Sequence, residues 1–224
     1  MLYLEPNELL VADLDLWLAA NTPTTPFNKS ENYDQHRYHD VISVAFDRNK
    51  PRHSMRRKIW EKGFTGPQLR FYEPAITSVV TEFLEKIAST AATTGKSIDI
   101  SEYSLYVVCD IMGKVGLSKD FYAVKNARSD MIRLLTALFS PVGKAGRMQW
   151  PLNLLKGFNM MPKVVSEWEE WLVVETRDRV ERGEKQELND LMTQLVEEWK
   201  ESPRTGKDTR LLEADTAAVL VGAT

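Results

Sequence analysis

Residues 51–64, P-R-H-S-M-R-R-K-I-W-E-K-G-F, decide how the rest of the chain is interpreted, because they predict a strongly basic amphipathic helix. Side chains three and four positions apart share a face of a helix. Four side chains are therefore expected on one broad side: His53, Arg56, Arg57 and Trp60. Cations beside apolar rings favour an anionic ligand at the edge of an apolar pocket, but a charge run is also typical of a solvated helix face. The spacing alone leaves both interpretations open.

The composition is that of an ordinary globular protein with a buried core. Of the 224 residues, 43% are apolar and 27% are charged. The formal net charge is −3, so the basic run over 48–62 is a local patch in a protein that is not basic overall. This balance argues against a dedicated nucleic-acid-binding protein.

Cys109 is the single cysteine, which excludes an internal disulfide framework and a multi-cysteine metal site. It lies in the apolar run L-Y-V-V-C-D-I-M and is expected to be a small core residue. Near the N-terminus, the acidic residues Glu5, Glu8 and Asp13 do not fit a secretory signal. The longest apolar run, 217–223, is shorter than the ~20 residues of a membrane-spanning helix. We therefore expect a soluble or peripherally attached chain.

Hydrophobic periodicity predicts a mainly α protein of about eight helices with a little strand. The expected elements are a β-hairpin over 2–11; helices over 14–20, 51–64, 67–90, 101–116, 123–139, 163–182, 188–200 and 208–224; and a short strand over 95–100. Two short segments are further helix candidates: 40–46, and 152–158 inside a loop over 142–162.

Special residues set several of these boundaries. Asp13 can cap the helix over 14–20. Pro74 predicts a kink or a later helix start near Glu73. Gly113 with Gly116 is expected to end one helix, and Ser140-Pro141 to stop another.

The order of these pieces carries a family resemblance. The string D-x-x-x-x-x-H-x-x-x-R-K over 47–58, followed by Phe64 and by L-x-x-Y-E-P-A-I over 69–76, resembles the C-helix region of the cytochrome P-450 haem-thiolate monooxygenases, particularly the fungal ones. Five further segments are similar to that family in the same order: L-E-P-N-E-L-L-V-A-D over 4–13 to its first β-sheet, F-N-K-S-E-N-Y over 27–33 to the loop before the B′ region, 101–116 with Asp110 to the E helix, L-N-D-L-M-x-x-L over 188–195 to the segment leading toward the I helix, and A-D-T-A-A-V-L-V-G-A-T over 214–224 to the opening of the I helix.

The resemblance covers essentially the whole chain, but only the front portion of the family's fold. It implies a single partial domain over 1–224, made of a β-hairpin (1–12), the helix B and B′ loop region (13–50), the C helix (51–64), the D to H helices (67–207) and the start of the I helix (208–224).

The resemblance also implies roles for individual residues. Arg57 would donate to a haem propionate, because a guanidinium fork suits a carboxylate. His53, one turn earlier, would contact the propionate or support the arginine. Gly222 and Ala223 would line the I-helix groove above the haem. The acid-alcohol pair that relays protons in the family is expected at or just after Thr224.

Two signatures of the family have no match in the 224 residues. The family holds the haem iron through a cysteine thiolate in an F-x-x-G-x-x-x-C-x-G loop, and Cys109 belongs to a different helix, so no metal-ligating residue is assigned. The string Glu201-Ser-Pro-Arg204 imitates the family's E-x-x-R pair, but Pro203 forbids the helix on which that pair sits. No N-terminal membrane anchor is recognised either.

We therefore expect a truncated cytochrome P-450, inactive as it stands. An intact parent would be an oxidoreductase of fungal secondary metabolism that contains haem iron. It would insert one oxygen atom from O₂ into a small organic substrate with electrons from an NADPH-cytochrome reductase. The parent would lie at the endoplasmic-reticulum membrane, and this chain, without an anchor, in the cytoplasm. Two alternatives remain: a non-enzymatic all-α interaction protein of the same ancestry, and an unrelated helical domain.

Overall fold

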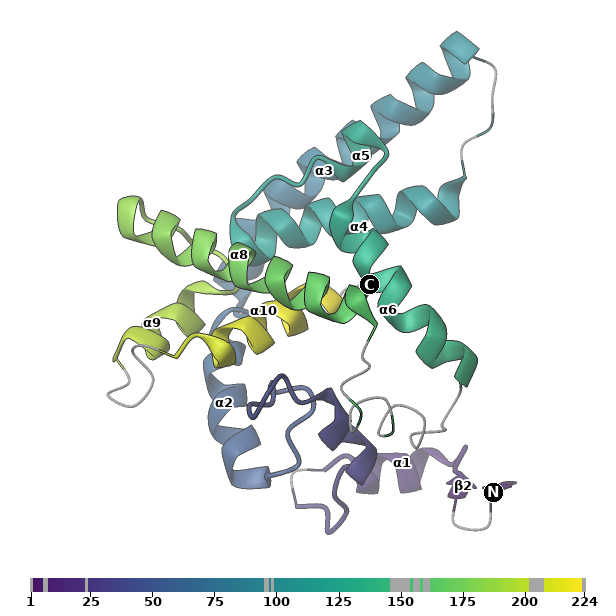
Figure 1. Cartoon of the computed structure of the whole chain (residues 1–224), viewed down its shortest axis with the longest axis vertical. Coiled ribbons are helices and arrows are strands. Elements are labelled where there is room, and N and C mark those ends of the chain that lie inside the picture. The colour runs from purple at the N-terminus through teal and green to yellow at the C-terminus, as the bar shows by residue number, and fades with distance from the viewer. Residues whose placement is uncertain are drawn as a thin grey trace.

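The computed structural model describes residues 2–5, 8–22, 24–94, 97, 99–145, 154, 158, 162–201 and 208–222, and it is mainly helical (Figure 1). The elements are β1 (Leu2–Glu5), β2 (Glu8–Leu10), α1 (Leu14–Ala20), the 3-10 helix η1 (Glu31–His36), α2 (Lys50–Lys62), α3 (Gly66–Thr94), α4 (Ile100–Leu117), α5 (Ala123–Asn126), α6 (Asp130–Ala145), α8 (Lys163–Lys185), α9 (Thr193–Glu201) and α10 (Arg210–Val221). The predicted mainly α class is confirmed.

The predicted β-hairpin and first helix are also confirmed. Strands β1 and β2 pair antiparallel, with Leu2 opposite Leu10. Asp13 caps α1 as expected, since its carboxylate accepts the backbone N–H of Leu16 at 3.0 Å. The predicted turn at Pro6-Asn7 lies outside the described residues.

Helix α10 lies at the centre of the fold and packs against α4, α8 and α9 (Figure 1). Most of its described side chains are buried, including Leu212, Val219 and Leu220. The crossing with α4 is close, because a Cβ atom on Gly116 would lie 2.5 Å from Val219 Cγ1. A glycine is needed there for the two helices to approach this closely.

The prediction that Gly113 and Gly116 end a helix is wrong. Both lie inside α4, which continues to Leu117 and ends at Ser118 in the left-handed conformation (φ 50°). The glycines serve packing instead: a Cβ at Gly113 would lie 2.6 Å from the Phe121 ring. The pattern of small residues therefore reflected close contacts and not a helix end.

The helix predicted over 123–139 is two helices, α5 and α6. The chain breaks at Ala127, which has a φ of 48°. Asp110 fixes the start of α5, because its carboxylate accepts the backbone N–H groups of Ala123 (2.8 Å) and Val124 (2.9 Å). A buried side-chain cap from another helix is a tertiary effect that local periodicity does not show.

Other boundaries differ from the predictions by a few residues or more. Helix α3 starts at Gly66 and contains Pro74, α6 continues past Pro141, α8 ends at Lys185, and α9 starts at Thr193. A proline removes one backbone hydrogen bond, and neighbouring bonds can still maintain the helix.

The predicted short helix at 40–46 is not formed. An isolated bridge between Tyr38 and Val41 and a turn at Ser43 occupy that region, and the irregular segment instead holds η1. The predicted strand over 95–100 and the predicted helix at 152–158 lie largely outside the described residues.

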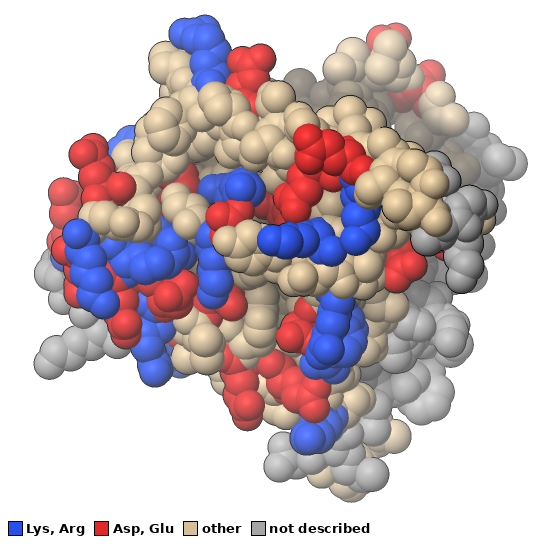
Figure 2. All heavy atoms as spheres, turned by 90° about the horizontal axis from the view of Figure 1, so that it is seen from above, with Lys and Arg blue, Asp and Glu red and all other residues tan. Residues whose placement is uncertain are grey.

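The surface carries charges of both signs. On the face shown in Figure 2, acidic and basic side chains are interspersed and not gathered by sign. Within the described part of the chain, every helix is too short or too polar to cross a membrane.

Substituting Gly116→Ala tests the close crossing of α4 and α10. We expect the free energy of unfolding to fall by about 1–3 kcal/mol, because the new methyl group overpacks Val219. Urea unfolding followed by circular dichroism measures this. Gly66→Ala is the matched control, since the nearest heavy atom to its Cβ would be 3.9 Å away at Arg70. An equal loss in both variants would contradict the packing role.

Candidate functional site

The start of helix α2 is fixed by three neighbouring residues. The Asn49 side chain caps the helix by accepting the backbone N–H of Arg52 at 3.0 Å. The buried carboxylate of Asp47 accepts two hydrogen bonds from the Arg52 guanidinium, 2.5 and 2.8 Å long. It also accepts the backbone N–H of Asn49 at 2.9 Å. These contacts join the first turn of α2 to the preceding loop.

The loop over 22–34 is joined to the residues just before α2 by basic side chains. Lys29 Nζ donates to the Ala45 carbonyl at 2.7 Å. Arg48 Nε donates to the Lys29 carbonyl at 3.0 Å, and its NH1 pairs with Asp34 at 2.5 Å. Lys50 also donates to the Thr25 carbonyl. These contacts hold the described residues of this loop beside α2.

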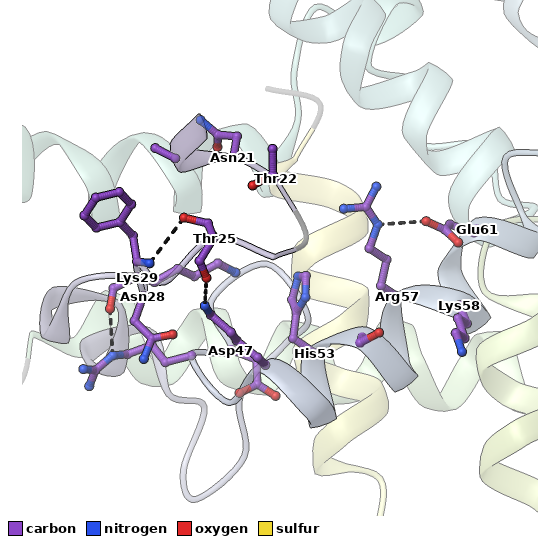
Figure 3. Close-up of a pocket in the computed structure, with 15 residues that line it drawn as sticks. Asn21, Thr22, Thr25, Asn28, Lys29, Asp47, His53, Arg57, Lys58 and Glu61 are labelled. Atoms are coloured by element: carbon purple, nitrogen blue, oxygen red, sulfur yellow. Dashed lines mark hydrogen bonds and ion pairs between the residues drawn. The ribbon is translucent and has the colours of Figure 1, made fainter. Parts of the chain in front are cut away.

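A cavity of about 690 Å³ lies between this loop and α2 (Figure 3), a size within the range of small-molecule sites. It is lined by Ala20, Asn21, Thr22, Thr25, Phe27, Asn28, Lys29, Asp47, Arg48, Lys50, His53, Ser54, Arg57, Lys58 and Glu61. We call it the α2 cavity.

His53 and Arg57, one helical turn apart, project from the same side of α2 into this cavity (Figure 3). Arg57 Nε donates to Glu61 Oε1 at 2.8 Å. The rest of the guanidinium points away from Glu61 (Figure 3), and the side chain is 66% exposed. The structure thus brings together two of the residues that the sequence marked as anion-binding.

The environment of the cavity disfavours the protonated forms of His53 and Lys29. Burial lowers the pKa of His53, and the positive charges of Lys29 and Arg57 lower it further, against a smaller opposite effect of Asp47. Burial also lowers the pKa of Lys29. A bound anion would relieve this repulsion, so the electrostatics of the α2 cavity match a negatively charged ligand.

Arg56 does not share the side of Arg57, and the predicted grouping of His53, Arg56, Arg57 and Trp60 is wrong in this respect. Arg56 is buried and pairs with Asp215 on α10; its NH1 also lies 3.6 Å from Glu198 on α9. Adjacent helix residues point about 100° apart, which separates the two arginines.

Burial dominates the electrostatics of Asp215. It raises the pKa of this carboxyl to about 7, with the Arg56 charge lowering it and the Glu198 charge raising it. Asp215 Oδ1 and Arg56 Nε are buried without hydrogen-bond partners among the described residues. The pair therefore costs more in desolvation than its attraction returns.

The remaining predicted site residues lie elsewhere. Gly222 follows the end of α10 and is not among the residues that line the α2 cavity. Ala223 lies outside the described residues. Cys109 is fully buried in α4; burial raises its thiol pKa to about 12, and its Sγ lies 3.2 Å from Ser129 Oγ. Such a thiol does not form the thiolate that ligates iron.

Two residues important to this region were not found from the sequence. Asp215 could have been noticed as an acidic residue inside an otherwise apolar helix, which needs a buried cation as a partner. Lys29 carries no local signal, because only the folded loop brings it to the cavity. No group of three or more metal-ligating side chains occurs in the described part of the chain.

Comparison with known proteins identifies the family. The cytochrome P-450 family model matches residues 20–220. Because this match extends over most of the chain, the protein belongs to the cytochrome P-450 family.

Similar curated proteins are fungal. The cytochrome P-450 monooxygenase FCK2 of Fusarium pseudograminearum is 24% identical over 218 residues. The cytochrome P-450 monooxygenase phqL of Penicillium fellutanum is 26% identical over 219 residues, and the tryprostatin B 6-hydroxylase of Aspergillus fumigatus is 21% identical over 220. Each alignment covers 96% of this chain and 38% of the relative, so the chain spans well under half of their length. No solved structure matches the chain significantly.

Replacing Arg56 and Arg57 separately by methionine distinguishes the environments of the two side chains. At pH 8 we expect Arg56→Met to lower the free energy of unfolding by about 3–5 kcal/mol, because it leaves the Asp215 carboxylate buried without a partner. We expect Arg57→Met to change it by less than about 0.5 kcal/mol, since Arg57 is exposed. Urea unfolding measures both. Similar losses would contradict the assignment of Arg56 to the interior.

The pH dependence of stability tests the environment of Asp215. With a pKa of about 7 in the folded state and 3.8 as the ordinary value, the folded chain holds a proton that the unfolded chain releases between these values. Stability should therefore fall as pH rises from 4 to 7, by about 4 kcal/mol in total from this group. We expect Asp215→Asn to remove this part of the slope in urea unfolding. An identical pH dependence of the free energy of unfolding in the wild type and the variant would contradict a raised pKa of Asp215.

Proposed function

We propose that this chain supplies the propionate-binding side of the haem pocket of a cytochrome P-450 monooxygenase. The observation that carries the proposal is the cluster of His53, Arg57 and Lys29 at one cavity, where the positive charges of Lys29 and Arg57 lower the pKa of His53. An ionised carboxylate is the ligand that a guanidinium fork binds best.

The residues fit one side of the haem and not the other. Arg57 and His53 would hold the propionates, and the Phe27 and Ala20 side chains offer apolar contacts in the same cavity. No described residue fits the axial position, since the only cysteine is buried in α4 with a raised pKa. The 224 residues by themselves are therefore proposed to lack monooxygenase activity.

The whole protein's reaction follows from the family. Haem, when bound through a cysteine thiolate, supplies the chemistry that cleaves the O–O bond of dioxygen. The complete enzyme is proposed to oxidise a small organic molecule in fungal secondary metabolism, with electrons from an NADPH-linked reductase. The part of this chain is to bind and orient the propionates: Arg57 holds the carboxylate, and His53 supports it with its own positive charge when protonated.

A second candidate is a non-enzymatic interaction protein derived from such an enzyme. One observation favours it: Leu69, Ile76, Val80 and Leu84 form an exposed apolar row along one side of α3. An interaction protein requires no ligand in the α2 cavity, so a hemin titration distinguishes this candidate from the haem-binding function.

Hemin and its dimethyl ester separate propionate binding from apolar association. We expect the chain to bind hemin more tightly than the dimethyl ester, since only hemin has free carboxylates. Arg57→Ala should weaken hemin binding about 10- to 100-fold, as expected for a charged hydrogen bond, and leave the ester unchanged. Absorbance titration of the Soret band measures both.

Lys62→Ala is the control, because Lys62 lies at the end of α2 and does not line the cavity. Hemin affinity should also rise as pH falls through the pKa of His53, since the protonated imidazole attracts the carboxylate. Equal affinity for hemin and its ester in the wild-type chain would overturn the proposal.

A further inference from the structure

Helix α2 carries two adjacent arginines, and only one of them faces the α2 cavity. A rotation of the helix by one residue, about 100°, would exchange Arg57 for Arg56 there. Both side chains are guanidinium groups of equal length. The chemistry of the cavity alone therefore does not decide which arginine faces it.

The two arginines are distinguished by the contacts on the side of α2 that faces away from the cavity. The side chains of Arg56, Ile59 and Trp60 turn toward the protein interior, and a Cβ at Gly63 would lie 3.1 Å from Leu191. Among these, Arg56 has the only directional partner, the carboxylate of Asp215, which lies 159 positions further along the chain.

We propose that the ion pair between Arg56 and Asp215 is a positioning contact that fixes the rotation of α2 about its axis, so that His53 and Arg57 face the cavity. This deepens the proposed function, on which the role of Arg57 toward haem rests.

The energetics favour positioning over stabilisation as the role of the pair. Asp215 is completely buried on α10, beside Arg56 and Trp60 of α2 and Glu198 of α9. Replacing such a pair by apolar residues of similar volume is often neutral or favourable for stability, whereas a buried pair of fixed geometry can specify one arrangement. An apolar contact tolerates sliding and rotation, and a guanidinium-carboxylate contact does not.

The packing around the pair suits this role. Helix α2 packs chiefly against α9, while α10 is held in the core by α4, α8 and α9. Asp215 thus sits on a helix anchored in the core, and its neighbour Thr216 accepts a hydrogen bond from Thr176 Oγ1 of α8 at 2.9 Å. The contact therefore fixes the orientation of α2, which lies at the periphery of the core, relative to α10.

The ionisation of His53, measured without any ligand, reports the rotation. NMR titration of the chain gives the pKa of His53, assigned by its loss in His53→Gln. In the wild type it should lie below the ordinary value of 6.5, because of burial and Lys29. Asp215→Leu, which removes the hydrogen-bond acceptor whether or not the carboxyl is ionised, should raise it toward 6.5, with far-UV circular dichroism unchanged. Arg210→Met is the control, since it breaks the pairs of Arg210 with Asp40 and Asp208 at the start of α10 and leaves Asp215 and Arg56 in place.

Arg56→Lys keeps the inference testable if Asp215→Leu does not fold. It retains a buried cation but lacks the planar fork. The pKa of His53 should therefore also rise, by less than in the Asp215 variant. An unchanged His53 pKa in either folded variant would overturn the inference.

Hemin binding then separates this inference from the proposed function. If both hold, Asp215→Leu weakens hemin binding about fivefold or more, and Arg57→Ala costs less affinity in that variant than in the wild type. If Arg57→Ala leaves hemin affinity unchanged in the wild type, the proposed function fails, and the ligand-free pKa of His53 still decides whether the pair positions α2.

Discussion

The buried ion pair between Arg56 and Asp215 is the constraint on which the geometry of this site depends. Ion pairs at the surface are screened by water and contribute little. This one lies between α2 and the central helix α10, where removing two charges from water costs several kcal/mol. Burial raises the pKa of Asp215 even though the Arg56 charge lowers it. Its value to the fold is therefore geometric, since it connects the basic helix to the core.

The α2 cavity is the second consequence of this arrangement. Once α2 is fixed, the basic side chains of the loop over 22–34 and of α2 itself lie around one space. The positive charges of Lys29 and Arg57 lower the pKa of His53 in the absence of a ligand. A site prepared in this way would bind an anion without much rearrangement, which is the usual advantage of preorganised binding.

Much of the fold could be predicted from local pattern, because the hairpin and α1 are coded by residues close in the chain. The split between α5 and α6 could not, since it depends on the Asp110 side chain from another helix. Gly113 and Gly116 carried an ambiguous signal, because small residues serve both helix ends and close packing.

The site shows the same division between local and tertiary information. His53 and Arg57 were found from their spacing and from the family resemblance, with Gly222 and Ala223 as further candidates that remain untested. The opposite orientation of Arg56 could not be predicted from α2 alone, because adjacent arginines are equivalent until a partner is known. That partner, Asp215, is distant in sequence, and Lys29 reaches the cavity only through the folded loop.

A solved structure of the chain with hemin bound tests the central claim most directly. We expect a propionate oxygen within about 2.7–2.9 Å of an Arg57 guanidinium nitrogen, with Arg56 still paired to Asp215. Hemin bound with its propionates on Arg56, or bound away from the α2 cavity, would contradict the account.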